Sequence, residues 1–198
     1  MIRRTLIAVA CIAALVGSAQ AGPAEDQRDL ARISNYLNAT ETLVGDFVQV
    51  DPDAVVSEGD FFMRRPGRLR FEYDNPNPAL VIADGFWVAV IDRRDGGLDR
   101  TPLSETPLDL LLRERVDLRR ENAVTRIERS NGQLAVTAVD PDNPGLGEIT
   151  MVFANNPLTL RQWVVTDAQG RTTTVALRDT RTNVPVSAEK FVIPGAPE

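Results

Sequence analysis

Short runs of alternating apolar and polar residues, separated by tight-turn dipeptides, occupy most of this sequence from residue 43 onward. Three such dipeptides, each between two runs, are Pro66-Gly67, Asp84-Gly85 and Asn131-Gly132. They favour short turns, and the alternation is typical of strands with one buried face. Strands joined by turns this short must run antiparallel. The sequence therefore predicts a meander of about ten or eleven antiparallel strands.

Two helical segments interrupt the predicted strands. The first begins near residue 23 and ends near residue 39, and its apolar stripe is made of Leu30, Ile33, Tyr36 and Leu37. The second, at residues 106–115, has an apolar face of Leu108, Leu111 and Leu112 and must therefore lie against the sheet. The expected fold class is mainly β (α+β): a single large antiparallel sheet, curled into an open barrel with the helices across its mouth.

Two strands carry more specific expectations. Residues 86–91 are apolar on both faces of their strand, which predicts cover on both sides. Residues 191–193 are expected to form one more short strand near the end of the sheet.

Residues 1–21 have the pattern of a cleavable secretory signal peptide. This leader combines a basic start, an apolar run at residues 6–16 and an Ala-Gln-Ala cleavage site. Cys11 lies inside the apolar run and raises the alternative of a lipoprotein signal, but the residues before it lack the usual leucine. We therefore expect an exported chain that begins at Gly22, with residues 22–198 as a single domain.

The charge balance argues against two classes of partner. The whole chain has 22 basic and 28 acidic residues, a net charge of −6. Without Arg3 and Arg4 of the leader, 20 basic and 28 acidic residues remain, a net charge of −8. An acidic protein of this kind is a poor ligand for nucleic acid and for anionic lipid surfaces.

Residues with catalytic or metal-binding chemistry are scarce. The sequence has no histidine, and its single cysteine lies in the predicted leader, which excludes Ser-His-Asp and Cys-His catalysis and most zinc sites. Ser187 and Lys190 match a Ser-x-x-Lys pattern, and Glu58 and Asp60 are two residues apart, but neither pair has the partners that catalysis requires. We expect a protein that is not an enzyme and has no catalytic residues, metal or cofactor.

The predicted hairpin at residues 59–73 presents one apolar face. Alternation places on this face Phe61, Met63 and Arg65 of the first strand and Leu69, Phe71 and Tyr73 of the second. The guanidinium of Arg65 therefore lies at the end of an apolar surface. It is either an edge arginine that extends to solvent or an arginine at the mouth of an apolar cavity, and the pattern alone leaves both open.

An ordered set of motifs resembles a known family. The motifs are Gly-Asp-Phe-Val-Gln at 45–49, Gly-Asp-Phe-Phe-Met-Arg-Arg-Pro at 59–66, Phe-Glu-Tyr at 71–73, Val-Ile-Ala-Asp-Gly at 81–85 and the Thr-Pro-Leu-Asp segment that begins at 106. Taken together they are similar to those of the LolA family of periplasmic outer-membrane lipoprotein carriers. The resemblance runs from the first helix to residues 191–194, although no single motif is specific.

The resemblance implies a half-barrel of antiparallel strands closed by a helical lid over an apolar cavity. Family members accept acylated lipoproteins from an inner-membrane ABC transporter, shield the acyl chains across the periplasm and pass the cargo to an outer-membrane receptor. The family's gate arginine corresponds to Arg65, which in the closed form bonds the lid helix, here residues 106–113. The candidate lipid-binding residues beside it are Leu37, Phe47, Met63, Leu69, Phe71, Leu108, Leu111 and Leu112. The chain is expected to act as a monomer.

Two further functions stay open at this point. One is a periplasmic sensor of the same fold, which binds lipids or lipoproteins and regulates a membrane partner. The other is a secreted hydrolase that uses carboxylates. A carrier is the preferred interpretation. A sensor of this fold usually has a second domain, for which we expect no room in residues 22–198, and the motif search for catalytic groups found no complete constellation for a hydrolase.

Overall fold

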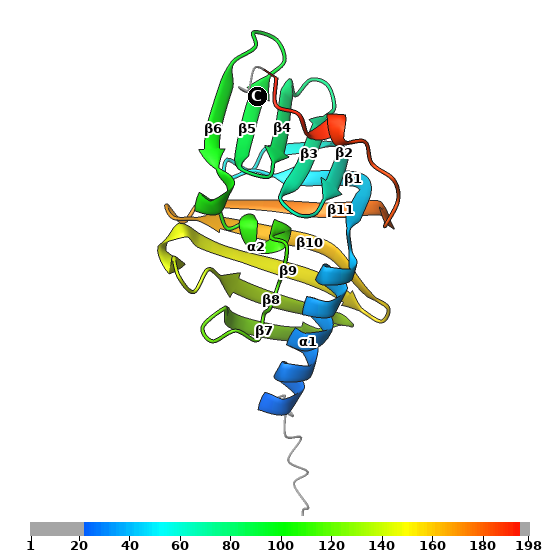
Figure 1. Cartoon of the computed structure of the whole chain (residues 1–198), viewed down its shortest axis with the longest axis vertical. Coiled ribbons are helices and arrows are strands. Elements are labelled where there is room, and N and C mark those ends of the chain that lie inside the picture. The colour runs from blue at the N-terminus through cyan, green and yellow to red at the C-terminus, as the bar shows by residue number, and fades with distance from the viewer. Residues whose placement is uncertain (1–21, 195–198) are drawn as a thin grey trace, which may run out of the picture.

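One antiparallel sheet of eleven strands makes up most of the protein (Figure 1). The computed structural model describes residues 22–194, and the predicted leader lies outside them. The strands are β1 (Thr42–Val50), β2 (Val56–Arg64), β3 (Arg68–Tyr73), β4 (Ala79–Asp84), β5 (Trp87–Asp92), β6 (Leu98–Pro102), β7 (Val124–Ser130), β8 (Gln133–Val139), β9 (Gly147–Asn155), β10 (Leu158–Asp167) and β11 (Thr172–Thr182). The predicted single antiparallel sheet is confirmed.

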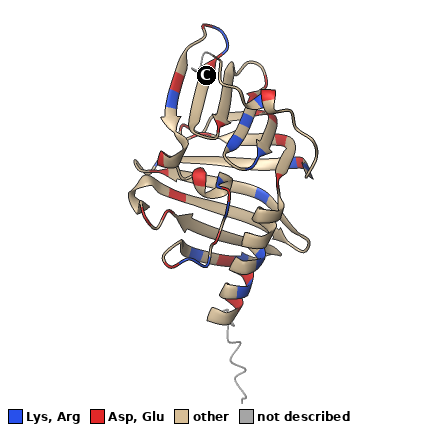
Figure 2. Ribbon diagram, in the orientation of Figure 1, with Lys and Arg blue, Asp and Glu red and all other residues tan. Residues whose placement is uncertain are grey.

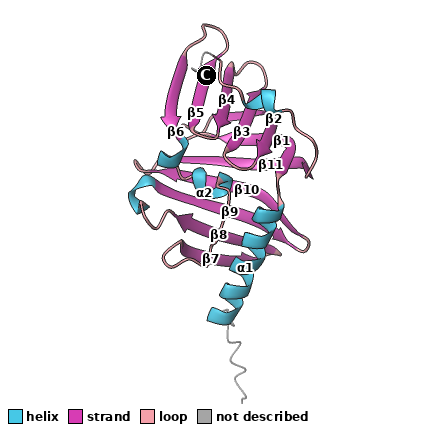
Figure 3. Ribbon diagram, viewed as in Figure 1, coloured by secondary structure: helices cyan, strands magenta, loops and turns pink. Residues whose placement is uncertain are grey.

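Both helices lie on the same side of this sheet (Figure 3). They are α1 (Pro23–Ala39) and the very short α2 (Asp109–Leu112), and 3-10 turns occur at Leu103–Glu105, Pro144–Leu146 and Ala188–Phe191. Proline suits the first position of α1, and the acidic residues of its first turn face the positive end of the helix dipole. The second helix is shorter than the predicted segment, whose first residues form turns.

The strand order follows from one long-range pairing. The order is β6-β5-β4-β3-β2-β1-β11-β10-β9-β8-β7, so two meanders meet where β1 pairs with β11, from Leu43 opposite Thr182 to Val50 opposite Thr174. Since β6 and β7 are consecutive in the chain but form opposite edges, the connection between them must cross the open side of the sheet. We call this connection, residues 103–123, the lid connection; it carries α2. The result is an open half-barrel.

The inner face of the half-barrel and the helices share one apolar core. Its largest fully buried side chains include Phe47, Phe61, Phe153 and Trp163. The rings of Phe47 and Phe71 meet edge to face with centroids 4.7 Å apart, a favourable aromatic geometry. From α1, the buried members of the predicted stripe are Leu30, Ile33 and Leu37. Figure 2 shows charged residues along α1 and β7, whereas β8 carries none, as expected for a strand beside the core.

The predicted strand at residues 191–193 is wrong. The segment instead contains the 3-10 turn Ala188–Phe191, in which the N–H of Glu189 donates to the hydroxyl of Ser187. Lys190 bonds Glu72, so both residues of the Ser-x-x-Lys pattern have structural partners. Ile193 then covers a small outer cluster made of Leu80, Ile82, Ala89 and Ile91. A run of three residues is too short for alternation to distinguish a strand from a covering segment.

The expectation that residues 86–91 are covered on both sides is also wrong. Ala89 and Ile91 are buried beneath the C-terminal segment, but Trp87 is 42% exposed and Val90 is 47% exposed. On the inner face Val88 still packs against the core, and Val90 lies beyond it. The strand is second from an edge, and the cover on each face ends before the strand does.

Within residues 22–194, no helix combines the length and the apolar character that crossing a membrane requires.

Candidate functional site

The turn between β2 and β3 places Arg65 at the end of the apolar inner face. Phe61 and Met63 point inward on β2, and Met63 pairs with Leu69 across the hairpin. Gly67 completes the turn with φ of 74°, and a Cβ there would lie only 2.7 Å from the Cα of Gly85. Only glycine fits this close approach with a positive φ. The predicted faces of the hairpin are therefore the observed ones.

The guanidinium of Arg65 joins the C-terminal ends of both helices. It donates to the carbonyl of Leu37 near the end of α1 and to the carbonyl of Arg113, which follows α2, at 2.5 Å. Two longer contacts of 3.4 Å reach the carbonyl of Glu114 and Oδ1 of Asn38. Carbonyls at a helix C-terminus have no partner within the helix and carry partial negative charge, so one cation can satisfy several of them.

The backbone of the same turn adds two bonds. The N–H of Gly67 donates to the carbonyl of Leu112 at 2.8 Å, and the N–H of Arg65 donates to the carbonyl of Glu41 at 2.8 Å. The N–H of Gly67 thus caps the C-terminal end of α2, and the N–H of Arg65 bonds Glu41, two residues after the end of α1. We call this arrangement the latch: Arg65 and Gly67 with the carbonyls of Leu37, Leu112 and Arg113.

Burial shapes the electrostatics of the latch. It lowers the pKa of Arg65 from its ordinary value, because a desolvated guanidinium loses hydration, yet an arginine stays charged at neutral pH. Its Nε is buried without a hydrogen-bond partner among the described residues. A buried unpaired donor costs about 1–3 kcal/mol, which weakens the closed arrangement. Arg65 is therefore a bonded, half-buried arginine rather than an edge arginine extended to solvent.

The predicted apolar residues meet beneath the latch. Residue exposure is at most 1% for six of them and 5% for a seventh, while Leu108 is partly buried and packs against the same core. The seven are Leu37, Phe47, Met63, Leu69, Leu111, Leu112 and Phe71. A side chain that faced an open cavity would keep accessible surface, so these side chains fill the space between lid and sheet themselves. The expected apolar cavity is closed in this structure, with the leucines of α2 occupying it.

A hydrogen-bonded tyrosine lies toward the opposite end of the apolar face. The hydroxyl of Tyr73 donates to Oε1 of Gln49 at 2.8 Å. Burial raises the pKa of Tyr73 to about 12, so the hydroxyl remains a neutral donor.

Several contacts of the helices had no signal in the sequence. Asn38 donates from Nδ2 to the carbonyl of Val116 and accepts from the N–H of Val116, both at 2.9 Å, which fastens α1 to the lid connection. At the other end of α1, Arg129 of β7 bonds Asp26 and Asp29, each at 2.8 Å. A helix-end asparagine and an arginine on a strand are too common to mark such contacts in advance.

Two grooves reach the surface beside the lid connection. One, of about 430 Å³, is lined by both polar and apolar side chains, and of the apolar ones Val88 and Val165 pack against the core. The other, of about 350 Å³, lies between the β2–β3 turn, the β4–β5 turn and α2, and includes Gly67 and Phe86.

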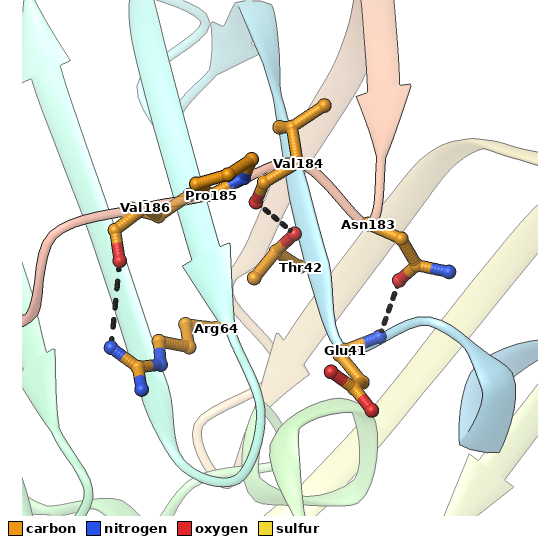
Figure 4. Close-up of a pocket in the computed structure, with 7 residues that line it drawn as sticks. All are labelled: Glu41, Thr42, Arg64, Asn183, Val184, Pro185 and Val186. Carbon is orange, nitrogen blue, oxygen red and sulfur yellow. Dashed lines mark hydrogen bonds between the residues drawn. The ribbon is translucent and has the colours of Figure 1, made fainter.

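A pocket on the outer face has a different character (Figure 4). It measures about 350 Å³ and is lined by Glu41, Thr42, Arg64, Asn183, Val184, Pro185 and Val186. Thr42 donates to the carbonyl of Val184 at 2.6 Å, and Arg64 to that of Val186 at 3.4 Å. Its polar atoms bind the C-terminal segment to the sheet. Neighbouring residues Arg64 and Arg65 therefore point to opposite faces of the sheet.

Among the described residues, no group of three or more His, Cys, Asp or Glu side chains is placed to hold a metal ion.

Comparison with known proteins gives a consistent result. Residues 38–194 match the family model described as "Outer membrane lipoprotein carrier protein LolA". An outer-membrane lipoprotein carrier protein from Halorhodospira halophila is 31% identical, with 94% of this chain and 88% of that protein covered. Proteins of the same name from Pseudomonas aeruginosa and Chromobacterium violaceum are 25% and 27% identical, covering 94% and 90% of this chain and 93% and 89% of theirs.

A solved structure of a LolA superfamily protein from Nitrosomonas europaea is also similar, at 10% identity and a TM-score of 0.43, covering 84% of this chain and 97% of that one. A likeness this distant has no bearing on function, and the assignment depends on the sequence matches. The family model covers most of the chain, and a relative above 30% identity covers nearly all of it. The chain therefore belongs to the outer membrane lipoprotein carrier protein LolA family.

Proposed function

We propose that this protein is a periplasmic chaperone that binds the acyl chains of lipoproteins beneath its lid and carries them toward the outer membrane. The observation that carries the proposal is the latch: a single arginine joins both helices over a closed apolar core. Relatives named as lipoprotein carriers support the cargo class. In this proposal Arg65 is the gate, and the apolar residues beneath it form the lipid-binding surface.

The closed core suggests how affinity is kept moderate. Each acyl CH₂ removed from water contributes about 0.8 kcal/mol, so several long chains would bind very tightly to an open apolar cavity. Here Leu111 and Leu112, both fully buried, occupy the space that the chains would take. Cargo must displace these leucines and break the Arg65 bonds, so closure competes with cargo. The carrier can therefore release its load without a nucleotide.

The surrounding pathway follows from the same proposal. Residues 1–21 are a cleaved signal peptide, and residues 22–198 are a single carrier domain that works as a monomer in the periplasm. An inner-membrane ABC transporter supplies the lipoprotein, and an outer-membrane receptor accepts it. The protein acts by binding rather than catalysis and needs no cofactor.

The test is to identify what the protein carries. The tagged protein is purified from its native periplasm without detergent, and bound proteins are identified by mass spectrometry. We expect acylated lipoproteins. Their amount on the protein should fall when lipid vesicles without lipoprotein are added, because the vesicles accept the released cargo. Recovery of only non-acylated proteins, or of one membrane regulator in a fixed ratio, would contradict the carrier function.

A further inference from the structure

The lid connection needs an external anchor to present its carbonyl to Arg65. Its helix α2 has only four residues, Asp109–Leu112, and the carbonyl that accepts the 2.5 Å bond belongs to Arg113, just past the helix end. So short a helix has little stability of its own. The position of the accepting carbonyl must therefore be set by contacts that the residues around α2 make elsewhere.

The side chain of Arg113 makes such contacts. Its Nη2 donates to Oδ2 of Asp109 at 2.7 Å and to Oδ2 of Asp140 at 2.9 Å. Asp109 belongs to α2 itself, whereas Asp140 lies in the loop between β8 and β9. Arg113 therefore contacts both meanders: its carbonyl is bonded to the β2–β3 turn and its side chain to the β8–β9 loop.

The environment of this pair favours a lasting contact. The side chains of Arg113 and Asp140 are 28% and 19% exposed. A neighbouring pair, Arg120 with Asp142, also joins the lid connection to the β8–β9 loop, but its side chains are 50% and 65% exposed. Exposed ion pairs contribute little because water screens them, whereas a charge-assisted bond at a partly buried site is stronger.

Asp140 is also held in its charged form. Burial alone would raise its pKa, but the N–H of Asp142 and the guanidinium of Arg113 lower the pKa below its ordinary value. The N–H of Asp142 donates to Oδ1 at 2.9 Å, which leaves Oδ2 for Arg113. Both oxygens of the carboxylate are thus used, and its orientation toward the lid connection is fixed.

We propose that Arg113 and Asp140 are positioning residues of the latch, whose ion pair holds the carbonyl of Arg113 within reach of Arg65. This inference rests on the proposed function, because it gives the lid a second fastening that must loosen when cargo enters. Without the pair, the lid connection would move away from Arg65, and the open, loaded form would gain population.

The first experiment measures the lid without any cargo. In a Cys11→Ser background, Leu111→Cys provides a single thiol at a position that is 0% exposed. Its labelling by a maleimide reports lid opening. We expect Asp140→Asn to raise the labelling rate roughly three- to tenfold, as loss of one charge-assisted bond would. Asp142→Asn, which makes the same chemical change two residues away, should alter the rate less than about twofold. Equal rates in the two variants would overturn the inference.

The second experiment measures release. A fluorescent triacylated lipopeptide is loaded on the protein and transferred to phosphatidylcholine vesicles. Asp140→Asn should slow transfer roughly three- to tenfold relative to Asp142→Asn, measured at a temperature where both variants are folded. In an Arg65→Leu background, Asp140→Asn should add nothing, since the bond that it positions is already gone. A further slowing there would show that Asp140 acts independently of Arg65 and would overturn the proposal.

The two experiments separate failure of the inference from failure of the proposed function. If the wild-type protein binds no lipopeptide, the carrier function fails, while a raised labelling rate in Asp140→Asn still supports the positioning role. If wild type binds and releases lipopeptide but Asp140→Asn behaves like Asp142→Asn in both assays, the positioning role alone is wrong.

Discussion

The two ends of α1 are fastened by different chemistry. At the C-terminal end, Arg65 donates to neutral carbonyls, including that of Leu37. At the N-terminal end, Arg129 forms charge pairs with Asp26 and Asp29, each at 2.8 Å. Carbonyl acceptors are equivalent along a backbone and can be exchanged for water, whereas removing one partner of a buried ion pair leaves a charge uncompensated. We infer that the N-terminal end is the fixed end of the helix and the C-terminal end the releasable one.

The largest expected effect comes from breaking the releasable end. Arg65→Leu removes charged hydrogen bonds worth roughly 1.5–3 kcal/mol and adds apolar surface, so both changes favour the loaded form. Cargo retained in the periplasm should rise by about tenfold or more, since 1.4 kcal/mol is tenfold in occupancy. The measurement is lipoprotein that co-purifies with the variant.

Arg64→Leu is the matched control for that change. Its side chain faces the outer pocket and bonds the carbonyl of Val186, so cargo retention should stay near wild type. Equal loading of the two variants would contradict a gate at Arg65. A heavier load on Arg64→Leu would show that the gate arginine lies on the opposite face of the hairpin.

A moderate effect is expected from breaking the fixed end. Asp29 is 7% exposed, and Arg129→Leu leaves it with Arg32 alone. The free energy of unfolding should fall by about 1–2 kcal/mol, because a buried charge loses a partner. Lipopeptide release, measured at a temperature where both proteins are folded, should change little. Arg126→Leu removes an exposed arginine of the same strand, which lies 3.9 Å from Glu128, and should leave unfolding unchanged. A release defect in Arg129→Leu as large as that of Arg65→Leu would erase the distinction between the two ends.

The smallest effect is expected from acid. The folded-state pKa of Asp140 lies below the ordinary 3.8, so its pair with Arg113 contributes stability above that value and loses it as pH falls through the lower folded pKa. The bonds of Arg65 to carbonyls do not titrate there. Lid opening can be followed with the Leu111→Cys thiol in the Cys11→Ser background, labelled at the acid pH itself with a pyridyl disulfide, which reacts with thiols in acid. The labelling rate should increase below pH 3.8 when Asp140 is present, and this increase should be absent when Asp140→Asn is added. An identical acid response in both proteins would assign it to other carboxylates.

How much of the fold and of the latch could be predicted from the sequence depends on how far apart in the sequence the contacting residues are. Alternation and turn dipeptides placed Met63, Arg65 and Leu69 on one face, because these signals are local. The pairing of β1 with β11 joins Leu43 to Thr182, and no local pattern marks it. The carbonyl partners of Arg65 were equally hidden, since every residue has a carbonyl and side-chain identity does not mark which one is used.

The errors have the same origin. Residues 191–193 were too few for their period to decide between a strand and a covering segment. The apolar character of residues 86–91 predicted cover that only neighbouring segments could supply, and these stop before Val90 and Trp87. The apolar cavity is not one of these errors: the structure shows the closed arrangement, in which Leu111 and Leu112 belong to the lid and to the core at once, and an open cavity stays a prediction.

The central pairing of β1 with β11 has a consequence for how the protein matures. Each meander consists of hairpins between strands that are consecutive in the chain. The β1–β11 pairing instead joins residues far apart in the sequence, such as Leu43 and Thr182. Contacts of such high sequence separation form slowly, because the intervening chain must first lose its freedom. As the chain folds, β1 must wait for β11, so the half-barrel is completed at its centre and not at its edges. A chain that still lacks β11 can build hairpins, but it has no enclosed interior in which a fatty chain could become trapped.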